Sequence, residues 1–401
     1  MDRRQFIRVM AAAGAGAALA STQGCETGSG SGETVALPAV RTSAFSTEIV
    51  LNSRRSYHSG FAGGLPEQVL SNVLRATGRA PLAGGSRTIY AALPDNVYRY
   101  DPARHELVLH LAGNHLSLAG LGFEVGIVNS LTEDAGVASQ FGLLAATAFW
   151  ADTSDQPGTC PSASAAENAT NSWGAGAVTF ASSYGLMGSV RGMTSELVAV
   201  SSDGSLPAPA TTGATIFEDA VEAVDYGTSF ASGDLAIGQL AQLAWASYGN
   251  TPHLASNGNA ALACPSSQAL YYLTGRIYIV RSVGTERSEI RLPGGSATTR
   301  DHRIERVIYG DRRPALRSAV TRIPQTAPVY FVYCGASGSR AELLESGFAA
   351  GGAVLQATSS GLRSSMTAGL SAAERTAVAA ALGLPSGDLP LLVLSAGAPG
   401  S

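Results

Sequence analysis

Lysine is missing from the 401-residue chain, in which all 26 basic residues are arginines. This absence excludes catalysis by a lysine Schiff base or a lysine general base. A bound phosphate would have to be held by arginine, histidine, hydroxyl groups or backbone N–H groups. Charge is scarce as well, because only 14% of the residues are charged and the net charge is −4. This balance argues against a general electrostatic grip on nucleic acid, so we expect no nucleic-acid partner.

Cysteine is also rare, with four residues in the whole chain: Cys25, Cys160, Cys264 and Cys334. They form no Cys-x-x-Cys motif and no cluster with histidine, so we predict no metal site. Their spacing selects no disulfide, although an exported protein could form one. Hydrophobic residues, in contrast, make up 45% of the chain. This composition predicts a large folded core, in two domains of ordinary size or in one large domain.

The N-terminus has the pattern of a targeting segment. Arg3 and Arg4, followed by Phe6 and Ile7, precede the short apolar run 9–20. The run is too short for a membrane-spanning helix, and the arginine pair predicts a twin-arginine export signal. An ordinary secretory signal is the alternative. Because twin-arginine export carries folded proteins, often with a cofactor bound, this signal is a first hint of a cofactor.

Two positions are candidates for the cleavage site at the end of this signal. The residues up to Ala20 fit ordinary cleavage, whereas Cys25 could instead be the lipid-modified residue of a lipoprotein. The residues after Cys25, ETGSGSGET, have the composition of a flexible tether. We therefore expect either a periplasmic protein or a membrane-anchored lipoprotein that touches the membrane only through a lipid on Cys25.

Periodic patterns downstream predict an internal duplication. Amphipathic helices are predicted at 65–77 and 235–249, a separation of about 170 residues that is too long for a solenoid unit. A helix rich in small residues is predicted at 345–362, with its counterpart expected at 167–188. A duplicated domain can pack as the two subunits of a homodimer would.

Strand patterns and breaks complete the predicted organisation. Residues 96–109 read as a hairpin, and residues 275–280 as a buried strand. The segment DGSLPAPATTGAT is rich in Pro, Gly, Ser and Thr and is typical of a linker. The predicted boundaries are a signal peptide at 1–24, a tether at 25–44, a first domain at 45–202, a linker at 203–215 and a second domain at 216–401.

Four stretches carry a resemblance to a known family. They are RRSYHSGF at 54–61, ACPSSQALYYLTGRIYIV at 263–280, the small-residue helix that ends in Gly-Leu in both halves, and ALGLPSGDLPLLVLSAGAP at 381–399. In order and spacing they resemble the nitroreductase family of flavin enzymes, especially its azoline-dehydrogenase branch. The resemblance covers most of residues 45–400. It implies an α+β fold with two nitroreductase-like domains, each an antiparallel or mixed sheet flanked by helices, packed as an intramolecular pseudo-dimer.

Family members are typically homodimers that hold flavin mononucleotide (FMN) between subunits. One subunit supplies the Arg-Arg-Ser segment and the other supplies the Pro-Ser-Ser turn. In this chain the first half has the Arg-Arg-Ser segment but carries APLAGG, at 80–85, in place of the turn. The second half has the turn but carries Val224-Asp225-Tyr226 in place of the arginines. The losses are complementary, and the resemblance therefore implies one intact FMN site.

The implied cofactor-binding residues are Arg54, Arg55, Ser56 and His58 on one side and Pro265, Ser266, Ser267 and Gln268 on the other. Guanidinium groups pair bidentately with phosphate, which gives the arginine pair its expected role. His58 stands where the family usually has Arg or Lys, and it is fully charged only when protonated. By the same resemblance, Arg191 and Gly192 should approach the flavin ring. Asp225 would repel a phosphate at the second position.

The expected function is that of an exported FMN-dependent oxidoreductase. It would transfer a hydride or electrons between the flavin and a small-molecule or peptide substrate, and we assign no side chain as catalytic because the flavin would do the chemistry. The Lys-Tyr pair used by azoline dehydrogenases is absent, so that particular activity is not implied. A single chain is expected to act as a monomeric pseudo-dimer. The alternative is a flavin-less nitroreductase-fold binding or scaffold protein at the cell envelope.

Overall fold

The computed structural model describes residues 33–149, 157–187, 193–196, 200–201, 205–254, 260–289 and 300–400. The predicted export signal, Cys25, Arg191 and Gly192 lie outside the described residues, as does the side chain of Gln268. Within the described ranges no helix has the length and apolar character needed to cross a bilayer.

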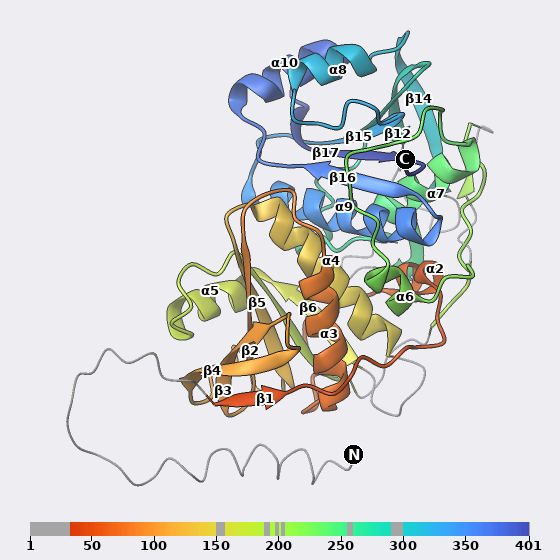
Figure 1. Cartoon of the computed structure of the whole chain (residues 1–401). Coiled ribbons are helices and arrows are strands. Elements are labelled where there is room, and N and C mark those ends of the chain that lie inside the picture. Colours follow the sequence, from red (N-terminus) through yellow and green to blue (C-terminus); the bar gives the residue numbers. More distant parts are fainter. Residues whose placement is uncertain are drawn as a thin grey trace, which may run out of the picture.

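Two sets of elements follow each other along the chain (Figure 1). The first set comprises β1 (Thr34–Ala36), α2 (Thr47–Ser53), α3 (Glu67–Arg79), β2 (Arg87–Ala92), β3 (Asn96–Asp101), β4 (Glu106–Ala112), β5 (Phe123–Asn129), α4 (Thr132–Ala148), β6 (Pro157–Ser162), α5 (Ala163–Ser172) and β7 (Phe180–Leu186). The short strand β8 (Val200–Ser201) pairs in parallel with β13 (Arg300–Asp301).

The second set begins with α6 (Phe217–Glu222). It continues with α7 (Ile237–Tyr248), β9 (Asn250–Leu254), β10 (Ala260–Leu262), the 3₁₀ turn η1 (Ser267–Ala269), β11 (Ile277–Arg281), β12 (Gly284–Glu289), β14 (Arg303–Tyr309), α8 (Arg313–Ala319), β15 (Val329–Gly335), α9 (Arg340–Ser359), β16 (Arg363–Thr367), α10 (Ala372–Leu382) and β17 (Leu389–Gly397).

The two large sheets share one topology. The first runs β1-β4-β3-β2-β5-β7-β6 and the second runs β14-β12-β11-β15-β17-β16, with antiparallel neighbours in both. Apart from the edge strand β1, each strand of one sheet has a counterpart at the same place in the other. The chain thus folds as an α+β protein with two sheet-and-helix units packed as an intramolecular pseudo-dimer, as the sequence predicted.

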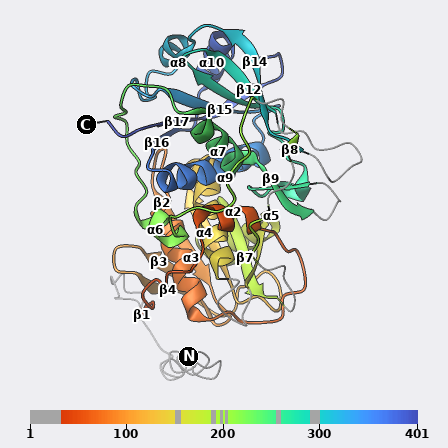
Figure 2. The same ribbon diagram turned by 90° about the vertical axis from the view of Figure 1, so that its right-hand side faces the viewer.

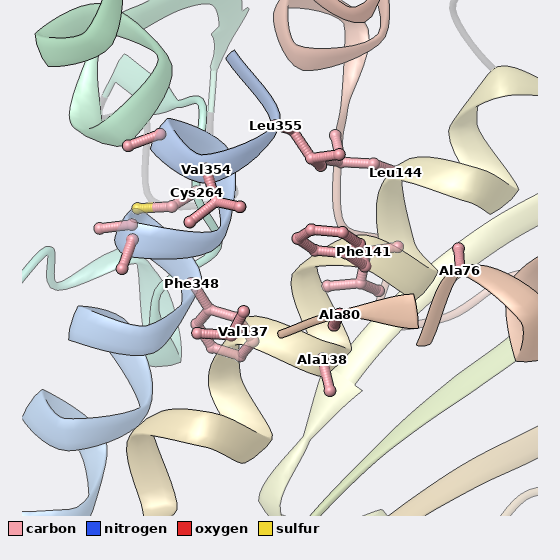
Figure 3. Packing of buried hydrophobic residues seen from close by; sticks show 14 of the residues in the cluster. Ala76, Ala80, Val137, Ala138, Phe141, Leu144, Cys264, Phe348, Val354 and Leu355 are labelled. Atoms are coloured by element: carbon pink, nitrogen blue, oxygen red, sulfur yellow. The ribbon is translucent and has the colours of Figure 1, made fainter. Parts of the chain in front are cut away.

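Helices fill the space between the two sheets, where α4 and α9 lie side by side (Figures 1 and 2). One continuous apolar cluster includes residues of both halves, among them Val137, Phe141 and Leu144 of α4 and Phe348 and Val354 of α9 (Figure 3). Smaller clusters bury the outer faces, under α5 in the first half and under α8 and α10 in the second. Because the largest core is common to both halves, each half completes the burial of the other.

The sequence of α9 explains its central position. Ser339 and Glu342 form a capping box at its start, which satisfies N–H groups that the helix leaves unpaired. Its middle, from Ser346 to Ala357, is buried and consists mostly of small and apolar residues. Such a helix has no polar face for solvent and is stable only when other elements surround it.

Glycines set the distance between α4 and α9. A Cβ on Gly136 would lie 3.0 Å from the Cα of Gly347, and a Cβ on Gly347 would lie 2.9 Å from the Cα of Gly136. A Cβ on Gly347 would also overlap the carbonyl oxygen of Glu133. The two backbones touch at this crossing, and only hydrogen atoms fit between them.

Most predicted elements are confirmed, and one is wrong. The helices at 65–77 and 235–249 and the hairpin at 96–109 appear as α3, α7 and the β3–β4 pair. The counterpart of α9 is not at 167–188, where α5 ends at Ser172 and the strand β7 follows. It is α4, which occupies the same place in the topology. Small residues carry no helical period of their own, so they fit the fully buried strand β7 equally well.

We expect Gly347→Ala to destabilise the fold by about 1–3 kcal/mol, because the added methyl group forces apart two backbones that cannot move independently. Gly238→Ala in α7 is the matched control, since its Cβ would meet no atom within 4 Å. This control should be neutral or stabilising by about 0.5–1 kcal/mol. Denaturant unfolding of both variants measures the difference, and equal stabilities would contradict the glycine contact.

Candidate functional site

Arg54 joins the two halves at the C-terminal end of α2. Its Nε donates to the carbonyl oxygen of Ala263 at 3.1 Å, and its Nη2 donates to that of Leu262 at 3.1 Å. Its Nη1 donates to Ser56 Oγ at 3.2 Å. Gln140 of α4 also donates to the Ala263 carbonyl, at 3.1 Å. The first half therefore holds, through these hydrogen bonds, the segment that directly precedes Pro265.

Burial makes Arg54 unusual. The residue is 2% exposed, and no carboxylate of the described chain forms an ion pair with it. Burial lowers the pKa of the guanidinium, while the nearby Tyr271 and Cys264 side chains act in the opposite direction. A guanidinium has five N–H groups and three are used here, so two remain for another acceptor. A buried cation of this kind favours the approach of an anion.

The Pro-Ser turn lies in an insertion of the second half. In the first half, only residues 80–86 separate α3 from β2, whereas residues 249–276 separate α7 from β11. This segment, which we term the insertion loop, contains the β9–β10 hairpin and η1. Ala269 and Tyr271 adopt positive φ values of 54° and 50°, which cost side-chain-bearing residues energy. The Tyr271 N–H donates to Ser266 Oγ at 2.8 Å, which helps to hold this shape.

The residues after Arg54 lie along strand β6. The hydroxyl of Thr159 donates to the carbonyl of Arg55 at 3.1 Å, and the N–H of Tyr57 donates to the carbonyl of Thr159 at 2.8 Å. The guanidinium of Arg55 stacks on the Tyr57 ring, 5.4 Å from its centre. Arg55 is half-buried and forms no ion pair with the described carboxylates, so its charge is available to a ligand.

His58 is exposed and contacts a thiol. Its Nδ1 lies 3.2 Å from Cys160 Sγ. Burial raises the pKa of Cys160 to about 11, and Glu124 adds to this increase. The raised pKa favours the thiol form of Cys160 at neutral pH. Either partner can donate this hydrogen bond, depending on the tautomer of the imidazole. The exposed imidazole therefore has one ring nitrogen, Nε2, that is not in contact with this sulfur.

In the second half, the position that corresponds to Arg55 is occupied by an acid that pairs with a neighbouring arginine. The N–H of Gly227 bonds the Ser364 carbonyl of β16 at 3.0 Å, just as the N–H of Tyr57 bonds Thr159 of β6. Asp225, which corresponds to Arg55, accepts a hydrogen bond from Arg363 Nε at 2.7 Å. The acid at the second position is thus paired with an arginine of its own half at the partly exposed surface.

The structure brings some predicted residues together. Arg54 and Ser56 contact the insertion loop or each other, and Pro265 is buried directly after the Arg54 contacts. Ser266 is half-buried and Ser267 is exposed. Arg191 and Gly192 lie outside the described residues. The segment after them is held beside Arg54, because Asn52 Nδ2 donates to the carbonyls of Thr194 and Glu196 at 2.9 and 3.0 Å.

Sequence reasoning missed the polar groups behind the insertion loop. Glu345 of α9 is buried, and its Oε1 accepts hydrogen bonds from the hydroxyl of Tyr248 and from the N–H of Leu273, the latter at 3.1 Å. The available signal was an acidic residue near the start of an otherwise small and apolar helix. The three described cysteines are free thiols in the interior.

We expect Cys160 to react at least tenfold more slowly with iodoacetamide at pH 8 in the folded protein than in denaturant, because the thiolate is the nucleophile. The rate should climb as the pH approaches 11. Peptide mapping by mass spectrometry measures the rate at this position, and Cys160→Ser identifies the peptide. Rapid alkylation at pH 7 would show a thiolate instead and would contradict the raised pKa of Cys160.

Comparisons with known proteins show the fold. No protein-family model and no curated protein matches the sequence. Among solved structures, the chain is similar to a protein named a nitroreductase from Anabaena variabilis, with a TM-score of 0.60 and 13% identity over 86% of this chain and 93% of that one. A protein named a nitroreductase from Ralstonia eutropha matches at a TM-score of 0.40 and 20% identity over 53% of this chain and 97% of its own.

The Escherichia coli microcin synthetase McbBCD complex also matches, at a TM-score of 0.35 and 20% identity over 45% of this chain and 70% of that one. The match to the Anabaena protein covers most of each molecule. With this likeness and the two equivalent sheets, the chain has the nitroreductase fold.

Proposed function

We propose that this protein is an FMN-dependent oxidoreductase of the nitroreductase type with one flavin site. The observation that supports the proposal is the contact of Arg54, in the Arg-Arg-Ser segment of one half, with Leu262 and Ala263, which directly precede the Pro-Ser turn of the other half. Flavin sites of the fold are built from those two segments on different subunits. Here one polypeptide supplies both.

The residues around this contact fit a phosphate-bearing cofactor. Arg55, Ser56 and His58 offer a guanidinium, a hydroxyl and an imidazole at nearby positions of the chain, and the Ser56 hydroxyl also contacts Arg54. Arg54 itself is largely occupied with protein carbonyls, so its main task is to fix the opposite wall. Ser266 and Ser267 would form that wall, with Gln268 beside them, and Arg191 and Gly192 would approach the ring.

A bound flavin would supply the transfer of a hydride or of electrons. The protein's share is to bind, orient and exclude water. The second position does not fit the cofactor, because Asp225 and Arg363 satisfy each other there and present no free cation. One flavin per chain is therefore the expected stoichiometry.

We further propose that the protein works outside the cytoplasm, as a periplasmic protein or as a lipoprotein anchored through Cys25. The Arg3-Arg4 pair and the tether composition support this location. Nicotinamide cofactors are essentially cytoplasmic, so oxidation of a small-molecule or peptide substrate, with oxygen or a quinone as acceptor, is favoured over nitro reduction. The monomeric chain would contain the complete site.

The absorbance spectrum of the folded, purified protein tests the cofactor. We expect flavin bands with one FMN per chain, released on denaturation and identified by chromatography. A colourless protein that also fails to bind added FMN would refute the enzyme and support the alternative, a flavin-less binding or scaffold protein at the cell envelope.

Arg55→Ala tests the phosphate contact without disturbing the core. Loss of one charge-assisted hydrogen bond costs about 1.5–3 kcal/mol, which corresponds to an FMN affinity roughly 10–100-fold weaker. The unfolding midpoint should change little, because Arg55 forms no ion pair with the described residues. Arg104→Ala is the control, since this side chain is 74% exposed and, among the described residues, forms an ion pair with Glu106 alone. Fluorescence titration with FMN measures both, and equal affinities would remove Arg55 from the site.

A further inference from the structure

The insertion loop, residues 249–276, has to be held at both of its ends. It leaves α7 after Tyr248 and returns to the sheet through Tyr272 and Leu273. Two of its residues, Ala269 and Tyr271, have positive φ, and such backbone persists only where surrounding contacts hold it. Arg54 and Gln140 grip the loop at Leu262 and Ala263, which lie in its middle. A second anchor is therefore needed where the loop begins and ends.

Glu345 occupies that place. Its Oε1 accepts a hydrogen bond from the Tyr248 hydroxyl, at the outgoing end of the loop. The same oxygen accepts from the Leu273 N–H at 3.1 Å, at the returning end, and the Leu273 N–H also contacts the Tyr248 hydroxyl at 3.1 Å. The hydroxyl of Ser266 faces the carboxyl, although Oε2 has no partner at hydrogen-bond geometry in the described chain. One carboxyl thus joins both ends of the loop and faces the Pro-Ser turn.

The first half contains a matched arrangement without the loop. Asp134 of α4 precedes Gly136 by two residues, as Glu345 precedes Gly347, and the two glycines touch each other. Asp134 accepts hydrogen bonds from the N–H groups of Ala83 and Gly84 at 2.7 and 3.1 Å, in the short turn before β2. A carboxyl at this helix position therefore holds the turn before the first shared strand of each sheet. In the second half alone, that turn carries the Pro-Ser segment.

We propose that Glu345 is a positioning residue for the cofactor site, which fixes the insertion loop so that its Pro-Ser turn faces the Arg-Arg-Ser segment. The proposal rests on the proposed flavin site but makes a separate statement about the loop. Asp134 performs the same structural task for a turn that no longer contributes to a site. Glu345 and Asp134 thus hold equivalent turns, but only the turn held by Glu345 would carry part of the cofactor site.

The surroundings of Glu345 make the stability of the fold depend on pH. Burial raises the pKa of Glu345 to about 7, against the lowering effect of Ser266, Tyr248 and the loop N–H groups. The other groups facing this cluster are Cys264 and Tyr271 of the loop, Tyr333 of β15 behind Cys264, and the cation Arg54.

The sign of the pH effect follows from this shift. The folded protein favours the neutral form of Glu345, whose pKa in the unfolded chain is the ordinary 4.5. The contribution of Glu345 to the free energy of unfolding is therefore complete below pH 4.5 and is lost as the pH rises to about 7. Glu345→Gln keeps an acceptor for Tyr248 and Leu273 and cannot titrate. Its unfolding free energy should lack this part of the pH dependence.

The experiment compares Glu345→Ala, Glu345→Gln and Asp134→Ala in the full chain. Hydrogen–deuterium exchange should be at least tenfold faster in the peptide 262–274 of Glu345→Ala, and near the wild-type rate in Glu345→Gln. In Asp134→Ala the faster exchange should appear at residues 80–86 instead. FMN affinity should fall at least tenfold in Glu345→Ala, return in Glu345→Gln, and stay unchanged in Asp134→Ala.

Each result decides one statement. Unchanged exchange at 262–274 in Glu345→Ala overturns the positioning role, whatever the flavin affinity. Faster exchange with unchanged FMN affinity also overturns it, because the loop would then not determine binding. If the wild-type protein binds no FMN, the proposed function fails, and the exchange rates together with the pH dependence of unfolding still show whether Glu345 anchors the loop. If Glu345→Ala does not fold, Glu345→Gln carries the pH test.

Discussion

The contact between α4 and α9 is the constraint on which the rest of the structure depends. Gly136 and Gly347 let two helix backbones touch, and the apolar side chains around them form one core from both halves. The same two helices supply Gln140, Asp134 and Glu345, which hold the segments in front of β2 and β11. The same helix contact therefore lets Gln140 of the first half reach the insertion loop that Glu345 holds in the second half.

The two halves share one strand order but differ in the segments that follow their first and second helices. The strand order is the same, and each half lays the segment after its first helix along the same strand of its own sheet. Only the first half retains arginines there, and only the second carries the long loop with the Pro-Ser turn. In a homodimer both sites would change together, because each mutation appears twice. In a fused chain the two halves can change separately: Asp225 pairs with Arg363 in the second half, whereas the first half has Arg55 at the corresponding position.

The sequence predicted what local periodicity determines. The amphipathic helices α3 and α7 and the β3–β4 hairpin have clear periods, so local sequence predicted them. The complementary motifs predicted that the Arg-Arg-Ser segment and the Pro-Ser turn share a site, and the structure shows Arg54 bonded to Leu262 and Ala263, which precede that turn. Residues 167–188 were predicted as a helix and contain β7, because Gly, Ala and Ser suit a buried strand as well as a buried helix. The role of Glu345 was out of reach, since its partners are 72 and 97 residues away in sequence.

The covalent link between the halves has a thermodynamic consequence. Subunits of a separate dimer come apart on dilution, so the fraction that is assembled depends on how much protein is present. Here the partner surface is always tethered, at an effective concentration that the connecting segment sets, and encounter of the two halves is a unimolecular event. Contacts made across such a junction, such as those of Arg54 with Leu262 and Ala263, stay intact in a single isolated molecule, however scarce the protein becomes.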